Sequence, residues 1–594
     1  MPLADFIAYP SAAMPQTFAQ TFADPIDMQN RLFAELSRMF GREVPLYDRS
    51  LAVNRVCNTA VCELLGKRHL GFRVSADEIE RASGERHGAI RIGRADEYRW
   101  IGRFFGCFAM EPHNFYDMTN VGAKSQPIIA TAFRSAIHPD HRIFTSLLMT
   151  DYFDAATKAR IDALLAGRQV FSQRAKELIE RRERQGGLDP ADADALIAEG
   201  VNRIFKWTGK ARDHELYTAL GKAGFKIAAD IACFESHHLN HLTPNTLCMD
   251  LYTAAMKHCL GETDAERFRA RAALSLDRLA RAADRDWMAL HFKHVPASHF
   301  DQFRPGAPSP AEIAALIDGL VTILGQPEFD LRRLPHAGFK DLTEGPSEDT
   351  PILLRQDAYK ALTEPVTFAN PDGTTTNTTH TARFGEIEQR FYAVTAEGRT
   401  RYDRCLAAAE SERERDPGLP KRDVEAFEAH YARHFAEFPK TLPALLAGKL
   451  VYGSFLPTAQ GLAAAGKGSI QTTDLWELIR HGFVAFEGMR YEDFLPVSAA
   501  GIFASNLNQY GTKSTAAVRP TYTQATLEEI LGRPIIDAEE AYRGMEAESL
   551  WTTYSRLGLL ERLPIAEREG LERAKASAPR VARSAALPPQ HAGV

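Results

Sequence analysis

The chain has 594 residues, of which 45% are hydrophobic and 25% charged, and its formal net charge is −6. This composition is typical of a globular protein with a large core, and it argues against a nucleic-acid partner, for which a basic stripe is expected. No apolar run approaches the roughly 20 residues of a membrane-spanning helix, and residues 1–18 do not resemble a signal peptide. Seven scattered cysteines without a CxxC pair indicate reduced thiols, so we expect a cytoplasmic protein without a membrane partner.

The first 225 residues are predicted to be mainly helical around a strand-rich region. Ser75 and Glu78 have the spacing of a capping box, which predicts a helix that ends before Gly84. Other helices are expected where apolar residues recur at i, i+3, i+4 spacing. By these patterns we expect helices over 27–70, 75–83, 95–110 and 155–220, a strand at 87–93, and mixed strand and loop at 126–149.

The remainder of the chain is predicted to hold a second strand-rich region. The apolar run 226–234 is expected to be a strand, and the Pro-Asp-Gly sequence at 371–373 predicts the turn of a hairpin over 370–394. The segments 251–340 and 401–490 have helical patterns.

The predicted fold class is therefore α+β. The expected organisation is an N-terminal helical segment at 1–80, a first sheet module at 81–150, a helical insertion at 151–224, a second sheet module at 225–400 with a helical insertion at about 251–340, a helical C-terminal part at 401–570, and a disordered Ala/Pro/Arg-rich tail at 571–594.

Three short segments carry the residue types of a metal site. They are ERHGAIR at 85–91, HHLNHLTP at 237–244 and RFGEIEQR at 383–390. Two histidines and one carboxylate that leave metal positions open form the ligand set of many non-haem Fe(II) oxygenases. In the first segment, strand alternation places His87 and Arg91 on one face, so a metal at His87 and the guanidinium of Arg91 could hold the two ends of a small dianion. The alternative for this segment alone is a core histidine and a surface arginine.

The other two segments leave alternatives open when they are read alone. His237 and His241 have the i, i+4 spacing of a helical zinc site, but no Glu stands in the HExxH position and His238 also competes. In the third segment Glu386 and Glu388 share one strand face, so either carboxylate could be the ligand.

The order of several motifs resembles a known family. The matching segments are HGAIR at 87–91, TAFRS at 131–135, FTSLL at 144–148, NHLTP at 240–244, ILLRQ at 352–356, RFGEIEQR at 383–390 and DFLPVSAAGIF at 493–503. With these motifs the chain resembles the bacterial 2-oxoadipate dioxygenase/decarboxylases, or hydroxyglutarate synthases, of the vicinal oxygen chelate superfamily. The resemblance covers about residues 85 to 505.

The resemblance implies a fold and a set of site residues. The fold would be two βαβββ modules that form an incomplete barrel around a metal, with large helical insertions. The implied metal ligands are His87, His241 and Glu386, which would also be the catalytic centre, and both histidines would lie beside the substrate. Glu386 is favoured because Gln389-Arg390 resembles the Glu-x-Ile-Gln-Arg ending of the related hydroxyphenylpyruvate dioxygenases. The implied substrate contacts are Arg91, Val497 and Ser498.

The implied activity is Fe(II)-dependent conversion of 2-oxoadipate and O2 to 2-hydroxyglutarate and CO2, in lysine catabolism. Two alternatives are the same scaffold acting on another 2-oxo acid and a non-catalytic zinc-stabilised protein, although structural zinc sites are usually rich in cysteine. Arg355, Gln356 and Arg390 are weaker candidates for the second substrate carboxylate, with structural ion pairs as the alternative.

Overall fold

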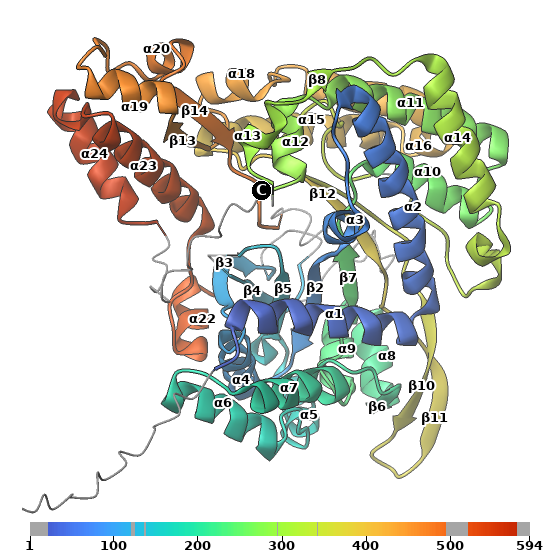
Figure 1. The fold of residues 1–594 in the computed structure, drawn as a ribbon. Helices are drawn as coiled ribbons and strands as arrows, with labels where there is room; N and C mark the ends of the chain where they lie inside the picture. Colours follow the sequence, from blue (N-terminus) through green and yellow to red (C-terminus); the bar gives the residue numbers. More distant parts are fainter. Residues whose placement is uncertain are drawn as a thin grey trace, which may run out of the picture.

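A computed structural model describes residues 22–119, 125–135, 138–293, 295–340, 343–494 and 521–578. In this part of the chain helices alternate with strands that form one five-stranded sheet and four smaller sheets (Figure 1), which confirms the α+β class. Among the described residues, no helix combines the length and the apolar character needed to cross a membrane.

Three helices precede the central sheet, as the sequence predicts. Asp24 caps the first of them, because its side chain accepts hydrogen bonds from the backbone N–H groups of Ile26 and Asp27 at 2.9 Å each. The predicted capping box between Ser75 and Glu78 is present at the start of the third helix. These helices are α1 (Pro25–Glu43), α2 (Pro45–Arg68) and α3 (Ala76–Ser83).

The central sheet has the strand order β3-β4-β5-β2-β7. Strand β2 pairs in parallel with β5 and antiparallel with β7, so a strand from far along the chain completes one edge. Helix α4 connects β2 to β3. The elements are β2 (Glu85–Ile92), α4 (Ala95–Gly106), β3 (Glu111–Asp117), β4 (Ile128–Arg134), β5 (Arg142–Leu148) and β7 (His241–Pro244).

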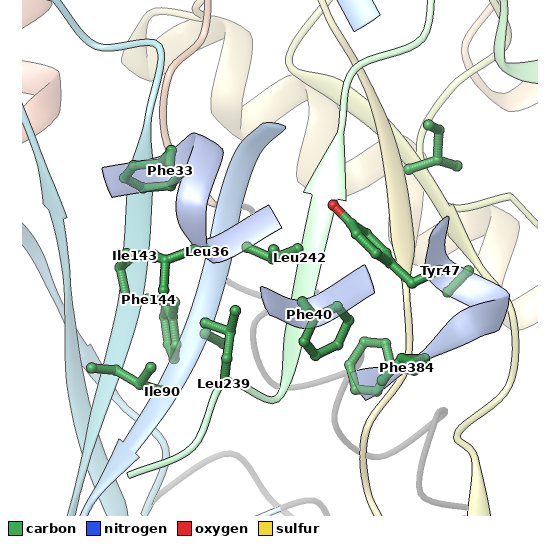
Figure 2. Packing of buried hydrophobic residues seen from close by; sticks show 14 of the residues in the cluster. Phe33, Leu36, Phe40, Tyr47, Ile90, Ile143, Phe144, Leu239, Leu242 and Phe384 are labelled. Atoms are coloured by element: carbon green, nitrogen blue, oxygen red, sulfur yellow. The ribbon is translucent and has the colours of Figure 1, made fainter. Parts of the chain in front are cut away.

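Helix α1 lies across this sheet. Figure 2 shows Phe33 and Leu36 of α1 beside Ile143 and Leu242 of the sheet, in one buried cluster. Gly88 of β2 lies in the same layer, where a Cβ atom would come within 3.0 Å of both Leu242 and the His241 carbonyl oxygen. Because Gly88 has no side chain, β2 and β7 can approach each other closely at this point. His87 is the residue immediately before it.

The segment between β5 and β7 is mainly helical. The prediction of a strand over 226–234 is wrong, because Lys226–Cys233 form helix α9. A short apolar run does not distinguish a buried strand from a buried helix, and the alanines at 228, 229 and 232 favour a helix. The elements here are α5 (Ala155–Ala166), α6 (Gln173–Gln185), α7 (Pro190–Glu199), β6 (Lys210–Arg212), α8 (His214–Lys222) and α9.

The predicted second strand-rich region holds strands of four different sheets, since β7 joins the central sheet, β8 pairs with β1, β9 pairs with β12, and β10 pairs with β11. The expected Pro-Asp-Gly turn lies between β10 and β11, but the hairpin ends at Thr381 and β12 pairs with β9 instead. The elements are α10 (Met249–Cys259), α11 (Ala265–Ala282), α12 (Arg285–His291), α13 (Ala297–Phe300), α14 (Pro310–Leu324), β9 (Leu354–Ala358), β10 (Thr363–Ala369), β11 (Thr375–Thr381) and β12 (Glu386–Arg390); β1 (His69–Leu70) pairs with β8 (Arg304–Pro305).

The described residues of the C-terminal part are helical apart from one antiparallel strand pair, which encloses two helices and which the sequence patterns do not predict. Residues 571–575, assigned to a disordered tail, instead continue the last helix. The elements are α15 (Ala396–Arg415), α16 (Leu419–Arg422), α17 (Val424–His434), α18 (Leu442–Ala447), β13 (Gly453–Pro457), α19 (Ala459–Gly466), α20 (Leu475–Arg480), β14 (Val484–Gly488), α22 (Gln524–Leu531), α23 (Ala538–Arg556) and α24 (Ile565–Lys575).

Candidate metal centre

Three side chains from distant parts of the chain meet in the protein interior. Nε2 of His87 lies 3.1 Å from Oε2 of Glu386, and Nε2 of His241 lies 3.5 Å from the same oxygen. The two imidazole rings meet edge to face with their centroids 5.5 Å apart. All three side chains are buried, and their candidate ligand atoms lie within 4.8 Å of one another. The structure thus brings together the three residues that the motifs single out.

The sheet places the two histidines as neighbours. In the β2–β7 ladder His87 pairs with Thr243 and Ala89 pairs with His241. His87 and His241 are therefore diagonal neighbours across the ladder, about 7–8 Å apart, which is within reach of aromatic and long side chains. Strand β12 brings Glu386 to the same place from a separate two-stranded sheet, which is linked to the end of β7 by the backbone hydrogen bond from Thr246 to Glu388 at 2.9 Å.

Glu388 lies on the other side of the His87 ring. Its Oε2 atom is 2.7 Å from Nδ1 of His87, whereas Glu386 faces Nε2. Arg142 and Arg390 both donate hydrogen bonds to Glu388. Burial raises the pKa of Glu388, but Arg390, His87 and Arg142 outweigh it and hold the pKa well below its ordinary value. Glu388 is therefore an ionised acceptor that orients His87 and leaves Nε2 for a ligand role.

Thr243 also belongs to this cluster, and sequence reasoning missed it. Its hydroxyl oxygen lies 2.9 Å from Nε2 of His87 and 3.2 Å from Oε2 of Glu386. A signal was available, because Thr243 stands two residues after His241 and strand alternation places both on one face.

The protonation states of the cluster suit a metal ion. Burial lowers the pKa of His241 to about 4, so its ring is neutral at neutral pH. Burial raises the pKa of Glu386, but electrostatic interactions with His241, His87 and Lys340 and the hydrogen bond with His87 outweigh it and leave the net pKa below its ordinary value. Metal ligands must be deprotonated, as a neutral imidazole and an ionised carboxylate are.

Arg91 is buried on β2, four residues after His87. Its guanidinium donates a hydrogen bond to Asp230 of α9. After burial itself, the positive charges of Arg91 and Lys340 are among the causes that lower the pKa of His241. Both cations therefore act electrostatically on the cluster.

The remaining candidates have other partners. Nε2 of His237 lies 3.1 Å from Glu97, away from the cluster, and His238 approaches Asp230 instead. The structure favours His241 among the three histidines of that segment. Arg355 donates a hydrogen bond to Asp250 at 2.7 Å, and Gln356 donates one to Glu344 at 3.2 Å. Arg390 donates to Glu388. Each of the three side chains therefore makes a structural contact.

The motif DFLPVSAAGIF reaches the cluster through its first residues. The ring of Phe494 meets His87 edge to face, with centroids 4.9 Å apart, and also packs on Phe144 of β5. The predicted substrate contacts Val497 and Ser498 lie outside the described residues.

The donor set fits a divalent metal ion. Bonds from such ions to imidazole nitrogen and carboxylate oxygen are about 2.0–2.2 Å, so neighbouring ligand atoms in an octahedral site lie about 3 Å apart. The separations of 3.1 and 3.5 Å from Glu386 to the two histidines are close to this value. A buried site with two histidines and one carboxylate is the pattern of mononuclear non-haem iron enzymes.

Comparison with known proteins identifies the family. A family model described as 2-oxoadipate dioxygenase/decarboxylase matches residues 32–263 and 327–506. The chain is 33% identical over 550 residues to the 2-oxoadipate dioxygenase/decarboxylase of Pseudomonas putida, covering 91% of this chain and 99% of the relative. The Escherichia coli K12 protein of that name is 30% identical over 542 residues, covering 88% and 97%. The chain belongs to the 2-oxoadipate dioxygenase/decarboxylase family.

A solved structure agrees with this assignment. The chain is similar to the hydroxyglutarate synthase of Pseudomonas putida, described in complex with 2-oxoadipate, with a TM-score of 0.62 and 31% sequence identity. The similarity covers 91% of this chain and 99% of the synthase.

Proposed function

We propose that this protein is an iron(II)-dependent dioxygenase and decarboxylase that converts 2-oxoadipate and O2 into 2-hydroxyglutarate and CO2. The observation that carries the proposal is the buried cluster of His87, His241 and Glu386, with Arg91 close enough to lower the pKa of His241, in a chain of this family. The activity is the one named for the two relatives, and the similar solved structure is described with 2-oxoadipate.

The proposed ligands are Nε2 of His87, Nε2 of His241 and a carboxylate oxygen of Glu386. When bound, iron(II) supplies adjacent positions for the carboxylate and keto oxygens of a 2-oxo acid and the redox chemistry that activates O2, which no side chain provides. Glu386 adds one negative charge and the neutral histidines add none, so the filled centre keeps a net positive charge. That charge attracts the anionic substrate.

Arg91 is proposed to bind the second carboxylate of the substrate. A guanidinium forms two parallel hydrogen bonds with a carboxylate, which sets the direction of the substrate chain as well as its affinity. The contact with Asp230 holds the Arg91 side chain in the interior, where little water competes for its N–H groups. The metal therefore binds one end of a diacid of suitable length and Arg91 binds the other. This favours 2-oxoadipate over a monocarboxylic 2-oxo acid.

Val497 and Ser498 are proposed to close the site over the substrate. They follow Phe494, which packs on the His87 ring with centroids 4.9 Å apart, so the motif that contains them begins at the centre. Closure would exclude water and so strengthen the ionic contacts of the substrate.

Two further expectations belong to this proposal. The succession β2, α4, β3, β4, β5 in one sheet has the order of a βαβββ module and supports a vicinal oxygen chelate arrangement, with an incomplete barrel around the metal. All seven cysteines are buried and unpaired, which supports a reducing compartment such as the cytoplasm. A place in lysine catabolism is proposed from the family's activity alone.

Isotope labelling tests the reaction. One 2-oxoadipate and one O2 balance one 2-hydroxyglutarate and one CO2, so the oxo acid supplies the electrons that reduce O2. The iron-loaded enzyme is incubated with 2-oxoadipate and 18O2, and the product is weighed by mass spectrometry. We expect one labelled atom in the new carboxylate and one in the C2 hydroxyl. Unlabelled product, a requirement for added 2-oxoglutarate, or no O2 uptake with any 2-oxo acid would overturn the proposal.

A further inference from the structure

A second group of metal-binding side chains lies in the interior, apart from the first. It consists of Asp230 on α9, His238 in the following loop and His380 on β11, each at most 3% exposed. Oδ1 of Asp230 lies 3.4 Å from Nε2 of His238 and 3.4 Å from Nε2 of His380. The three candidate ligand atoms all lie within 4.8 Å of one another, as in the first centre.

These separations suit a tetrahedral ion better than direct hydrogen bonds. Ligand atoms about 2.1 Å from a tetrahedral zinc ion lie about 3.4 Å apart. Within the described residues, neither Oδ1 of Asp230 nor Nε2 of His380 makes a hydrogen bond of normal geometry, although both atoms are buried. The two atoms form an ion pair at 3.4 Å, which is long for a direct contact between buried groups, and a ligand between them would satisfy both.

Asn240 is the candidate for a fourth ligand. Its Nδ2 atom lies 3.3 Å from Nε2 of His238 and 3.4 Å from Oδ2 of Asp230, while its Oδ1 atom is buried without a partner. The two ends of an amide side chain are interchangeable in such an assignment. With the amide turned by 180°, its oxygen faces the cluster and completes a set of two nitrogen and two oxygen ligands.

The surroundings prepare these atoms for an ion. The Tyr217 hydroxyl lies 2.8 Å from Nδ1 of His380 and can accept its proton, which leaves the lone pair of Nε2 for a metal. Arg91 binds Oδ2 of Asp230 and leaves Oδ1 directed at the histidines. The rings of Trp207 and His380 are stacked, with their centroids 5.9 Å apart, and this packing limits the rotation of the imidazole.

The neighbouring charges also accommodate a cation. Asp230 and Arg91 neutralise each other. The Arg383 guanidinium lies 4.8 Å from the centre of the Trp207 ring. It forms ion pairs with both Glu43 and Glu364, each at 2.6 Å. This group of three therefore carries one net negative charge. A divalent ion would therefore leave this buried region with a single net positive charge.

We propose that Asp230, His238 and His380, with Asn240, bind a second divalent metal ion of the late first transition row, zinc by preference. Imidazole nitrogen and carboxylate oxygen suit such ions, and a closed set of four protein ligands is typical of a structural site. The ion joins α9 to β11. It also secures Asp230, which holds Arg91, so it supports the residue that we assign to the substrate.

Metal stoichiometry of the full-length protein tests this site. Metal-free protein is titrated with Zn²⁺, dialysed and analysed by mass spectrometry for bound zinc. We expect two ions per chain in the wild type, one in His380→Asn, one in His87→Ala and none in the double variant. His291→Asn is a matched control, because His291 is also buried and stacked on a tryptophan, with centroids 3.9 Å apart, but lies in neither cluster. It should keep both ions.

The two sites can fail separately in this experiment. If the wild type binds one ion that survives His380→Asn and is lost in His87→Ala, the second site is refuted and the first stands. If the single ion is instead lost only in His380→Asn, the iron centre fails and the second site stands. Should His380→Asn not fold, a Co²⁺ titration of the wild type decides, because a tetrahedral site adds intense visible absorption. Its absence after saturation refutes the proposal.

Discussion

Nδ1 of His87 lies 2.7 Å from Oε2 of Glu388, a residue 301 positions further along the chain. Both side chains are completely buried, and Glu388 is held in place by Arg142 and Arg390. The carboxylate accepts the Nδ1 proton, so Nε2 is the nitrogen that faces Glu386 and His241. One hydrogen bond thus sets both the tautomer and the orientation of the first histidine of the centre.

Replacing Glu388 by Gln should weaken iron binding. The variant removes the charge that orients His87 but keeps the size of the side chain, and changes of this kind typically lower metal affinity about 10- to 100-fold. Iron affinity is measured by competition with a chelator, after circular dichroism has shown that the variant folds. Glu492→Gln is the control, because Glu492 also accepts from Arg142, at 2.6 Å, without touching His87. Equal loss of affinity in both variants would assign the effect to the ion network instead.

Removing a proposed ligand should remove iron. We expect His87→Ala, His241→Ala and Glu386→Ala to abolish turnover and to lower bound iron to background in folded protein, because two remaining ligands hold the ion poorly. His237→Gln, which changes a buried histidine paired with Glu97, should retain iron. Iron is measured by atomic emission after anaerobic loading. Full iron and full rate in His241→Ala would show that another histidine is the ligand.

Arg91→Lys should impair substrate binding but not metal binding. Lysine keeps the charge but lacks the planar pair of donors, and a hydrogen bond between charged groups contributes about 1.5–3 kcal/mol, so kcat/KM should fall about 10- to 100-fold. The decrease should appear mainly in KM for 2-oxoadipate, measured with an oxygen electrode. Arg86→Lys, a buried neighbour on β2 that donates to the Arg81 carbonyl at 2.8 Å, is the control. Loss of iron in Arg91→Lys would indicate a structural role instead.

Acid should destabilise the protein partly through His291. Burial lowers the pKa of His291 from 6.5 to about 3, so in the folded state it stays neutral while the unfolded chain takes up a proton below pH 6.5. The free energy of unfolding therefore falls as the pH drops from 6.5 towards 3, and between pH 7 and 5 this one group accounts for about 2 kcal/mol. The free energy of unfolding is measured with urea at pH 7 and pH 5. Its decrease between these pH values should be about 2 kcal/mol smaller in His291→Asn than in the wild type. An unchanged pH dependence would contradict this assignment.

Much of the candidate metal centre could be predicted because its signals are local. The capping box at Ser75, the breaker Gly84 and the short strand that carries His87 are all read from neighbouring residues, and the structure has them where the sequence places them. Strand alternation also put Glu386 and Glu388 on one face. It did not reveal that they contact different nitrogens of one ring, because that depends on the approach of β12 to β2 in space.

The second cluster could not be predicted in the same way. Asp230 lies in an apolar run that was assigned to a strand, and the run forms a helix because buried strands and buried helices share that pattern. His380 lies 150 residues further along, in a threonine-rich hairpin with no motif around it. A single signal was available. Asp230 is the one charged residue in the apolar stretch from Ile227 to Phe234, and a charged side chain is rarely buried without a partner.

Because β2 pairs with β7, the geometry of the centre does not depend on how long the chain between these two strands is. His87 and His241 are 154 residues apart, yet the sheet ladder makes them neighbours. Their spacing depends on backbone hydrogen bonds and not on the helices over residues 151–224, which reach the surface and return. The exposed turns of that excursion can therefore lengthen or shorten during evolution, or carry an inserted module by design, while the two imidazoles keep their separation.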